Sequence, residues 1–84
     1  MAFLFSDNAQ KVITHLQNTA GTDQTAQDIA DATGLPVKTV QGIVTSALKR
    51  RGLADRKEVE GFEKKVIYLT AAGLETDPMM EKPE

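Results

Sequence analysis

The 84-residue chain lacks cysteine and tryptophan and contains a single histidine, His15. Without cysteine it can form no disulfide framework, no zinc finger and no cysteine nucleophile. No apolar run approaches the roughly 20 residues that a membrane-spanning helix needs, and the N-terminus lacks the basic segment of a signal peptide. These absences predict a cytoplasmic protein that does not contact a membrane.

The sequence also lacks the motifs that carry catalysis or bind a cofactor. It has no phosphate-binding loop, no dinucleotide fingerprint and no pair of catalytic carboxylates. His15 has no cysteine or second histidine to work with, so we expect a surface or boundary residue of a helix. Asp28 and Asp31 could hold a cation, but their position favours the acidic first turn of a helix. We therefore predict a non-enzyme with no cofactor and no metal.

Helical periodicity is present over the first 51 residues. Apolar residues three and four positions apart predict helices over about 7–19, over about 26–34 and over 36–51. Thr25, with Asp28 three residues later, predicts an approximate capping box at the start of the second helix.

The pattern changes after the glycine at position 52. Residues 53–59 and 65–69 predict two strands of a hairpin, because the second is rich in β-branched and aromatic residues and a glycine lies between them. Thr70 can cap a short last helix that runs from 71 to about 76.

This order of elements predicts a mainly helical α+β fold, in which a three-helix bundle is followed by a two-stranded β-hairpin. Residues 1–76 are expected to form one small domain. Residues 77–84 contain two prolines and three acidic residues, so they are expected to be a disordered acidic tail.

Residues 26–45 have the spacing of a helix-turn-helix, with the small Ala30 at the helix contact, Gly34 in the turn and Val40 as the apolar anchor of the second helix. Such a motif followed directly by a hairpin resembles the winged helix-turn-helix family. Two segments are similar to MarR-like regulators, namely the exit from the recognition helix (Ala47-Leu48-Lys49-Arg50-Arg51-Gly52-Leu53) and the end of the wing (Leu69-Thr70-Ala71-Ala72-Gly73). The resemblance covers about residues 7–76 and implies a DNA-binding regulator.

One feature departs from the MarR-like pattern. Those proteins dimerise through long additional helices at both termini, whereas this sequence closes on a proline-containing tail. The expectation is therefore a minimal winged helix without that dimer interface and its effector cleft. A single domain of this size buries little surface on DNA, so we expect a homodimer or a partner protein. Phe3, Leu4 and Phe5 are candidates for the contact if they are not buried in the domain.

The net charge of -2 conceals an uneven distribution. Residues 36–66 contain eight basic and four acidic residues, a net charge of +4, and the rest of the chain carries -6. A local basic region of this kind is what double-stranded DNA attracts.

The outward face of the helix over 36–51 has hydrogen-bonding side chains and no acid. Lysine can bind guanine acceptors, glutamine can bind adenine, and threonine can bind either edge. We predict contacts to base edges from Lys38, Thr39, Gln41, Gly42 and Thr45. Phosphate contacts are predicted from Ser46, Lys49, Arg50, Arg56, Lys57, Lys64 and Lys65.

Two alternatives stay open at this point. A polar basic face is also typical of any solvated helix, and the hairpin cations could form cross-strand ion pairs with Glu58, Glu60 and Glu63. Phe62, at the hairpin tip, is expected to pack back on the sheet, or else to mark a protein contact. The competing function is a winged helix that serves as a protein-protein interaction module without binding DNA.

Overall fold

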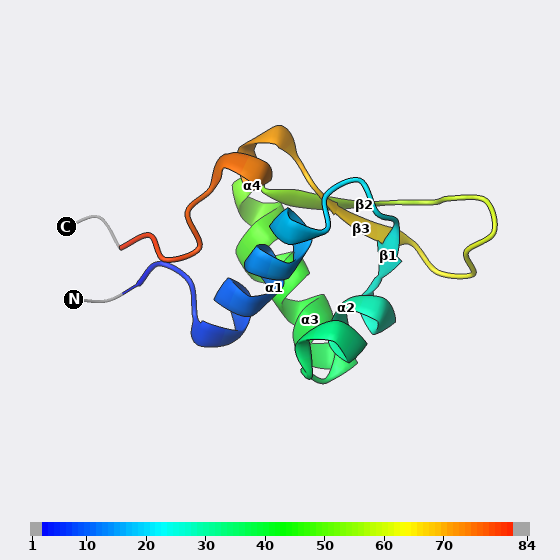
Figure 1. Cartoon of the computed structure of the whole chain (residues 1–84), viewed down its shortest axis with the longest axis horizontal. Helices are drawn as coiled ribbons and strands as arrows, with labels where there is room; N and C mark the ends of the chain where they lie inside the picture. Colours follow the sequence, from blue (N-terminus) through cyan, green and yellow to red (C-terminus); the bar gives the residue numbers. More distant parts are fainter. Residues whose placement is uncertain (1–2, 82–84) are drawn as a thin grey trace.

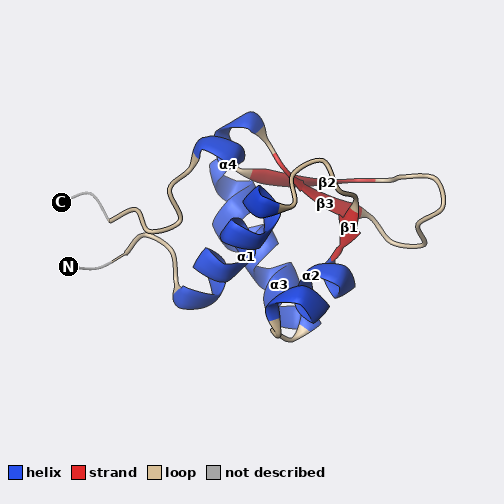
Figure 2. Cartoon of the chain, in the orientation of Figure 1, coloured by secondary structure: helices blue, strands red, loops and turns tan. Residues whose placement is uncertain are grey.

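A computed structural model describes residues 3–81 of the chain (Figure 1). The elements follow the order helix, strand, helix, helix, two strands, helix (Figure 2). They are α1 (Asp7–Asn18), β1 (Gln24–Thr25), α2 (Ala26–Thr33), α3 (Val37–Gly42), β2 (Ala54–Lys57), β3 (Val66–Leu69) and α4 (Ala71–Glu75). No helix in this part of the chain is both long and apolar enough to cross a membrane.

The helical predictions are confirmed with small shifts at the ends. The first helix ends one residue earlier than expected, and the predicted capping box of α2 is complete. Thr25 Oγ1 accepts a hydrogen bond from the Asp28 backbone N–H at 3.3 Å, and the Thr25 N–H donates one to the Asp28 carboxylate at 3.0 Å. Gly34 then ends α2 in the left-handed conformation, with φ at 76°, which glycine adopts without strain.

α3 continues without a break through Ile43–Leu48 and Lys49–Arg51, and we call the whole stretch, residues 37–51, the third helix. Its middle part is π-helical, a feature that the sequence did not predict. The apolar anchors Val40, Val44 and Leu48 are four residues apart and fully buried. In a regular α-helix such positions drift by about 40° at each step, and the wider π turn compensates for that drift.

A single core joins the three helices and the sheet. Val12, Ile13 and Leu16 of α1 pack with Ile29 of α2, the anchors of the third helix and Ile67 of β3. Full burial of each large aliphatic side chain contributes roughly 1.5–3 kcal/mol. The inner face of the third helix is buried in this core, so only its outer face is available to a ligand.

The sheet has three antiparallel strands in the order β1-β3-β2. The predicted two-stranded hairpin is thus correct for β2 and β3 but incomplete. Gln24 pairs with Ile67 and Thr25 with Val66, so the segment between α1 and α2 adds an edge strand. Two polar residues show no strand periodicity, and only their position beside β3 makes them a strand.

Gly73, in the segment that resembles the end of a MarR-like wing, is buried because α4 approaches the chain after the third helix. A Cβ atom at Gly73 would overlap the Leu53 carbonyl. Thr70 fixes this approach, since its hydroxyl donates to the Gly52 carbonyl at 2.6 Å and accepts from the Gly73 N–H at 3.2 Å. The Leu-Thr-x-x-Gly pattern is therefore a packing requirement of this fold.

The segments at the two described ends of the chain lie side by side (Figure 1). Phe3 forms an isolated bridge with Glu81, and the Leu4 N–H donates to the Met80 carbonyl at 2.8 Å. The sequence predicts a disordered tail over residues 77–84. In the structure, residues 78 and 79 form a turn, and residues 80 and 81 pair with a segment more than 70 residues away in the sequence. Residues 82–84 lie outside the described part.

Candidate nucleic-acid interface

The outer face of the third helix presents most of the predicted base-contacting residues. Lys38, Gln41, Gly42 and Thr45 are exposed, and Thr39 is half-buried. The face contains no acidic side chain, since the helix itself has none. These residues therefore form a continuous polar surface opposite the buried anchors.

Gly42 lies in the middle of this face with helical dihedral angles, φ at -62° and ψ at -42°. No protein atom lies within 4 Å of the place where a Cβ would stand. Neither backbone conformation nor packing therefore requires glycine here, although glycine in a helix interior costs about 1 kcal/mol relative to alanine. What glycine provides here is a helix backbone that a ligand can approach closely from the solvent side.

Ser46 and Lys49 extend the face toward the end of the third helix, and both are already engaged. The Ser46 hydroxyl donates to the Gly42 carbonyl at 2.6 Å. Lys49 Nζ lies 3.7 Å from Asp55 Oδ1 of β2, with both side chains about half exposed. An exposed pair of this kind contributes at most about 1 kcal/mol, so phosphate could displace Asp55 at low cost.

Arg56 of β2 is half-buried and reaches across to the third helix. Its Nη2 donates to Thr45 Oγ1 at 2.8 Å and to the Gln41 carbonyl at 3.3 Å. The sequence predicts Arg56 as a phosphate contact. In the structure, the guanidinium of Arg56 also joins β2 to the third helix and holds the Thr45 side chain in position.

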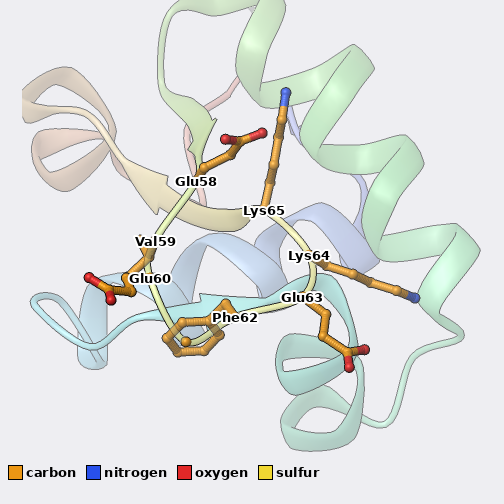
Figure 3. A pocket seen from close by; sticks show the side chains of 8 residues that line it. Glu58, Val59, Glu60, Phe62, Glu63, Lys64 and Lys65 are labelled. Atoms are coloured by element: carbon orange, nitrogen blue, oxygen red, sulfur yellow. The ribbon is translucent and has the colours of Figure 1, made fainter.

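We use "the wing" for β2, β3 and the loop 58–65 between them, and Figure 3 shows the side chains of that loop. Lys64 and Lys65 extend toward the third helix, whereas Glu60 and Phe62 point away from it (Figure 3). Lys57 lies over the ring of Tyr68, with 5.1 Å between Nζ and the ring centroid.

The cross-strand ion pairs that the sequence leaves open as an alternative are not observed in the described part of the chain. Within residues 3–81, the Lys49–Asp55 contact is the one ion pair, so Arg56, Lys57, Lys64 and Lys65 are not neutralised by the acids of the wing. The cations of the wing are therefore available to an external anion.

A cavity of about 300 Å³ separates the third helix from the wing. Its lining is Ala26, Gln41, Thr45, Arg56, Lys64, Lys65 and Ile67. It unites two predicted base-contacting residues with three predicted phosphate-contacting residues. The tertiary fold brings these five together from segments up to 24 positions apart.

Phe62 does not pack on the sheet as the sequence leads one to expect. Its side chain is 38% exposed at the wing tip, and it borders a hollow of about 380 Å³ that Thr25, Gln27 and Asp28 also line. The other side chains that line this hollow are polar, so Phe62 has no apolar partner there.

His15 occupies the boundary position that the sequence predicts, and its hydrogen-bond partner could not be predicted from the sequence. Its Nε2 lies 2.6 Å from Gln24 Oε1, and the Gln24 amide nitrogen donates to Thr19 Oγ1 at 2.7 Å. Gln24 is a buried polar residue of β1, so the network anchors the edge strand to α1. Residues 3–81 contain no cluster of three or more histidine, cysteine or acidic side chains that could hold a metal.

Comparison with solved structures places this arrangement in a known class of fold. The PcaV transcriptional regulator of Streptomyces coelicolor is 25% identical, with a TM-score of 0.71, over 83% of this chain and 48% of its own. MepR, a transcription regulator of Staphylococcus aureus, is 26% identical, with a TM-score of 0.73, over 83% of this chain and 50% of its own. A MarR family regulator of Neisseria meningitidis is 28% identical, with a TM-score of 0.67, over 83% of this chain and 48% of its own.

The protein therefore has the winged-helix fold of the MarR-like regulators, as the sequence resemblance implied. The chain spans about half the length of these structures. No protein-family model matches the sequence, and no curated protein is significantly similar to it.

Proposed function

We propose that this protein is a DNA-binding transcription regulator that places the third helix in the major groove and the wing against the sugar-phosphate backbone. One observation carries the proposal: the acid-free exposed face of the third helix adjoins the wing cations Arg56, Lys57, Lys64 and Lys65, and none of these forms an ion pair within residues 3–81. Further support comes from the structural neighbours, which are transcription regulators and include a MepR-DNA complex.

Base reading in this proposal falls to the predicted residues of the third helix. Gln41 makes its bond to Arg56 through the backbone carbonyl, so its side-chain amide can pair with adenine. Thr45 Oγ1 already accepts from Arg56, so its own proton can be donated to an acceptor on a base edge. Lys38, at the exposed start of the helix, can reach guanine acceptors.

Binding as a homodimer, or beside a partner protein, is part of the proposal because one small domain covers little DNA. The described chain ends lie opposite the wing (Figure 1), and Phe3, Met79 and Met80 expose apolar surface there. A contact through that end would leave the third helix and the wing free to face DNA.

Titration of random-sequence duplex DNA, followed by fluorescence anisotropy at several salt concentrations, tests this function. The logarithm of the affinity should fall linearly with the logarithm of the salt concentration, with a slope of about -0.9 for each phosphate contact. The control Lys11→Gln, on the exposed surface of α1, removes the same charge outside the interface and should leave the slope unchanged. Absence of binding at low salt would overturn the proposal and favour the interaction-module alternative.

A further inference from the structure

We infer that the wing tip, residues 59–63, is a contact surface for an arginine-containing basic segment of a partner protein. The tip carries an exposed aromatic ring, Phe62, and two exposed carboxylates, Glu60 and Glu63. Glu60 and Phe62 point away from the third helix, whereas Lys64 extends toward it (Figure 3). The tip is therefore directed away from the surface proposed for DNA, and its role goes beyond the proposed function and does not depend on it.

The charge of the wing tip favours a basic protein over a nucleic acid. Glu60 and Glu63 form no ion pair within residues 3–81, so no neighbouring cation neutralises either carboxylate. A phosphate backbone repels such carboxylates, and at physiological salt this repulsion acts over about 8 Å. A basic protein segment is attracted by the same two charges.

The exposed ring of Phe62 specifies arginine within such a segment. A phenyl ring attracts a cation over its face, and arginine makes this contact more often than lysine because its guanidinium is planar and weakly hydrated. The same group can also bind a carboxylate through two parallel N–H groups. The protein contains one such stack already, since Arg51 lies over the Phe5 ring with 5.7 Å between Cζ and the ring centroid.

The wing tip is a preformed turn with open space beside its ring. The Phe62 N–H donates to the Val59 carbonyl at 3.1 Å, and Gly61, with φ at 92°, completes the turn. The hollow of about 380 Å³ beside Phe62 is lined from the other side by the start of α2, and its lining includes two acidic side chains and one lysine. A preformed turn lowers the entropic cost of binding, and the hollow gives the arginine stem a place to lie.

The first arm of the test titrates the full chain with a short capped peptide of alternating arginine and alanine, followed by two-dimensional NMR. We expect saturable shifts of the amide resonances of Gly61, Phe62 and Glu63. A peptide with lysine in place of arginine should bind more weakly, and one with neutral citrulline more weakly still. Phe62→Ala should weaken binding of the arginine peptide about fivefold, and Glu60→Gln should weaken it roughly two- to fivefold.

The matched controls are Leu74→Ala and Glu75→Gln, because both side chains are exposed on α4, outside the wing. They remove the same kinds of group and should titrate like the wild type. If the lysine peptide binds as tightly as the arginine peptide, or if Phe62→Ala binds like Leu74→Ala, the inference is wrong.

The second arm measures duplex DNA binding of the same variants by fluorescence anisotropy. With the wing tip directed away from DNA, Phe62→Ala should leave the DNA affinity unchanged. A loss of DNA affinity in Phe62→Ala would place the ring on DNA, which would overturn the inference and leave the proposed function intact. Binding of the arginine peptide without any binding of DNA would support the inference and overturn the proposed function.

Discussion

Replacement of Gly42 by alanine should stabilise the protein and weaken its binding to DNA. The position has ordinary helical dihedral angles, and a new Cβ would meet no protein atom within 4 Å. The substitution therefore gains the difference in helix propensity, about 0.5–1 kcal/mol in the free energy of unfolding. For a domain of this size, that raises the melting temperature by roughly 3–6 °C.

The same methyl group would stand on the exposed face that we propose to lie against DNA. It would hold the helix backbone away from the groove, and we expect a loss of affinity of about fivefold, which corresponds to about 1 kcal/mol. Thermal and urea denaturation measure the first effect, and fluorescence anisotropy with duplex DNA measures the second. A fall in both stability and affinity would mean that the glycine serves the fold, and unchanged affinity would remove this face from the interface.

Gly21→Ala provides the contrast. Gly21 has φ at 89° and also has open space around it, so alanine there adopts a strained conformation. We expect a loss of about 1 kcal/mol in stability with DNA affinity unchanged, because the position lies on the loop after α1. A gain in stability for Gly42→Ala and a loss for Gly21→Ala would distinguish the effect of backbone strain from the effect of contact with DNA.

Gly73→Ala should destabilise the fold by about 3 kcal/mol in urea unfolding, because the added methyl overlaps the carbonyl of Leu53; a wild-type midpoint would contradict the packing described for α4. Arg56→Lys keeps the charge but cannot span both acceptors on the third helix, so sequence-specific affinity should fall while the salt slope stays near the wild-type value. Unchanged sequence-specific affinity would mean that the bonds from Arg56 to Gln41 and Thr45 are not needed for base reading. Gln41→Ala should alter the preferred base at one position in a binding selection from random DNA, and an identical preference would exclude this side chain from base reading.

The sequence could predict the elements with strong periodicity or strong local signals. The anchors of α1 and of the third helix, and the Thr25 capping box, depend on neighbours three and four residues away, so local spacing determines them. The same holds for the end of the wing, where Thr70 and Gly73 act on each other directly. The uneven distribution of charge is also a property of the sequence alone.

Other features depend on partners far apart in the chain, and only the tertiary structure decided them. β1 is a strand because β3 lies beside it, and the Leu4 N–H joins the segment after Asp77 to the N-terminal segment by its hydrogen bond to the Met80 carbonyl. The sequence shows that Arg56 and Lys65 are basic, but only the structure shows that they line one cavity together with Thr45.

The sequence by itself therefore determined the order of the elements, the buried face of each helix and the basic region from residue 36 to residue 66. These are consequences of local periodicity and of composition, which need no knowledge of distant contacts. The edge strand β1, the π-helical turn of the third helix and the cavity between the third helix and the wing depend instead on contacts between distant segments. Packing joins residues that are remote in sequence, and the arrangement of the wing cations around Thr45 is one of its results.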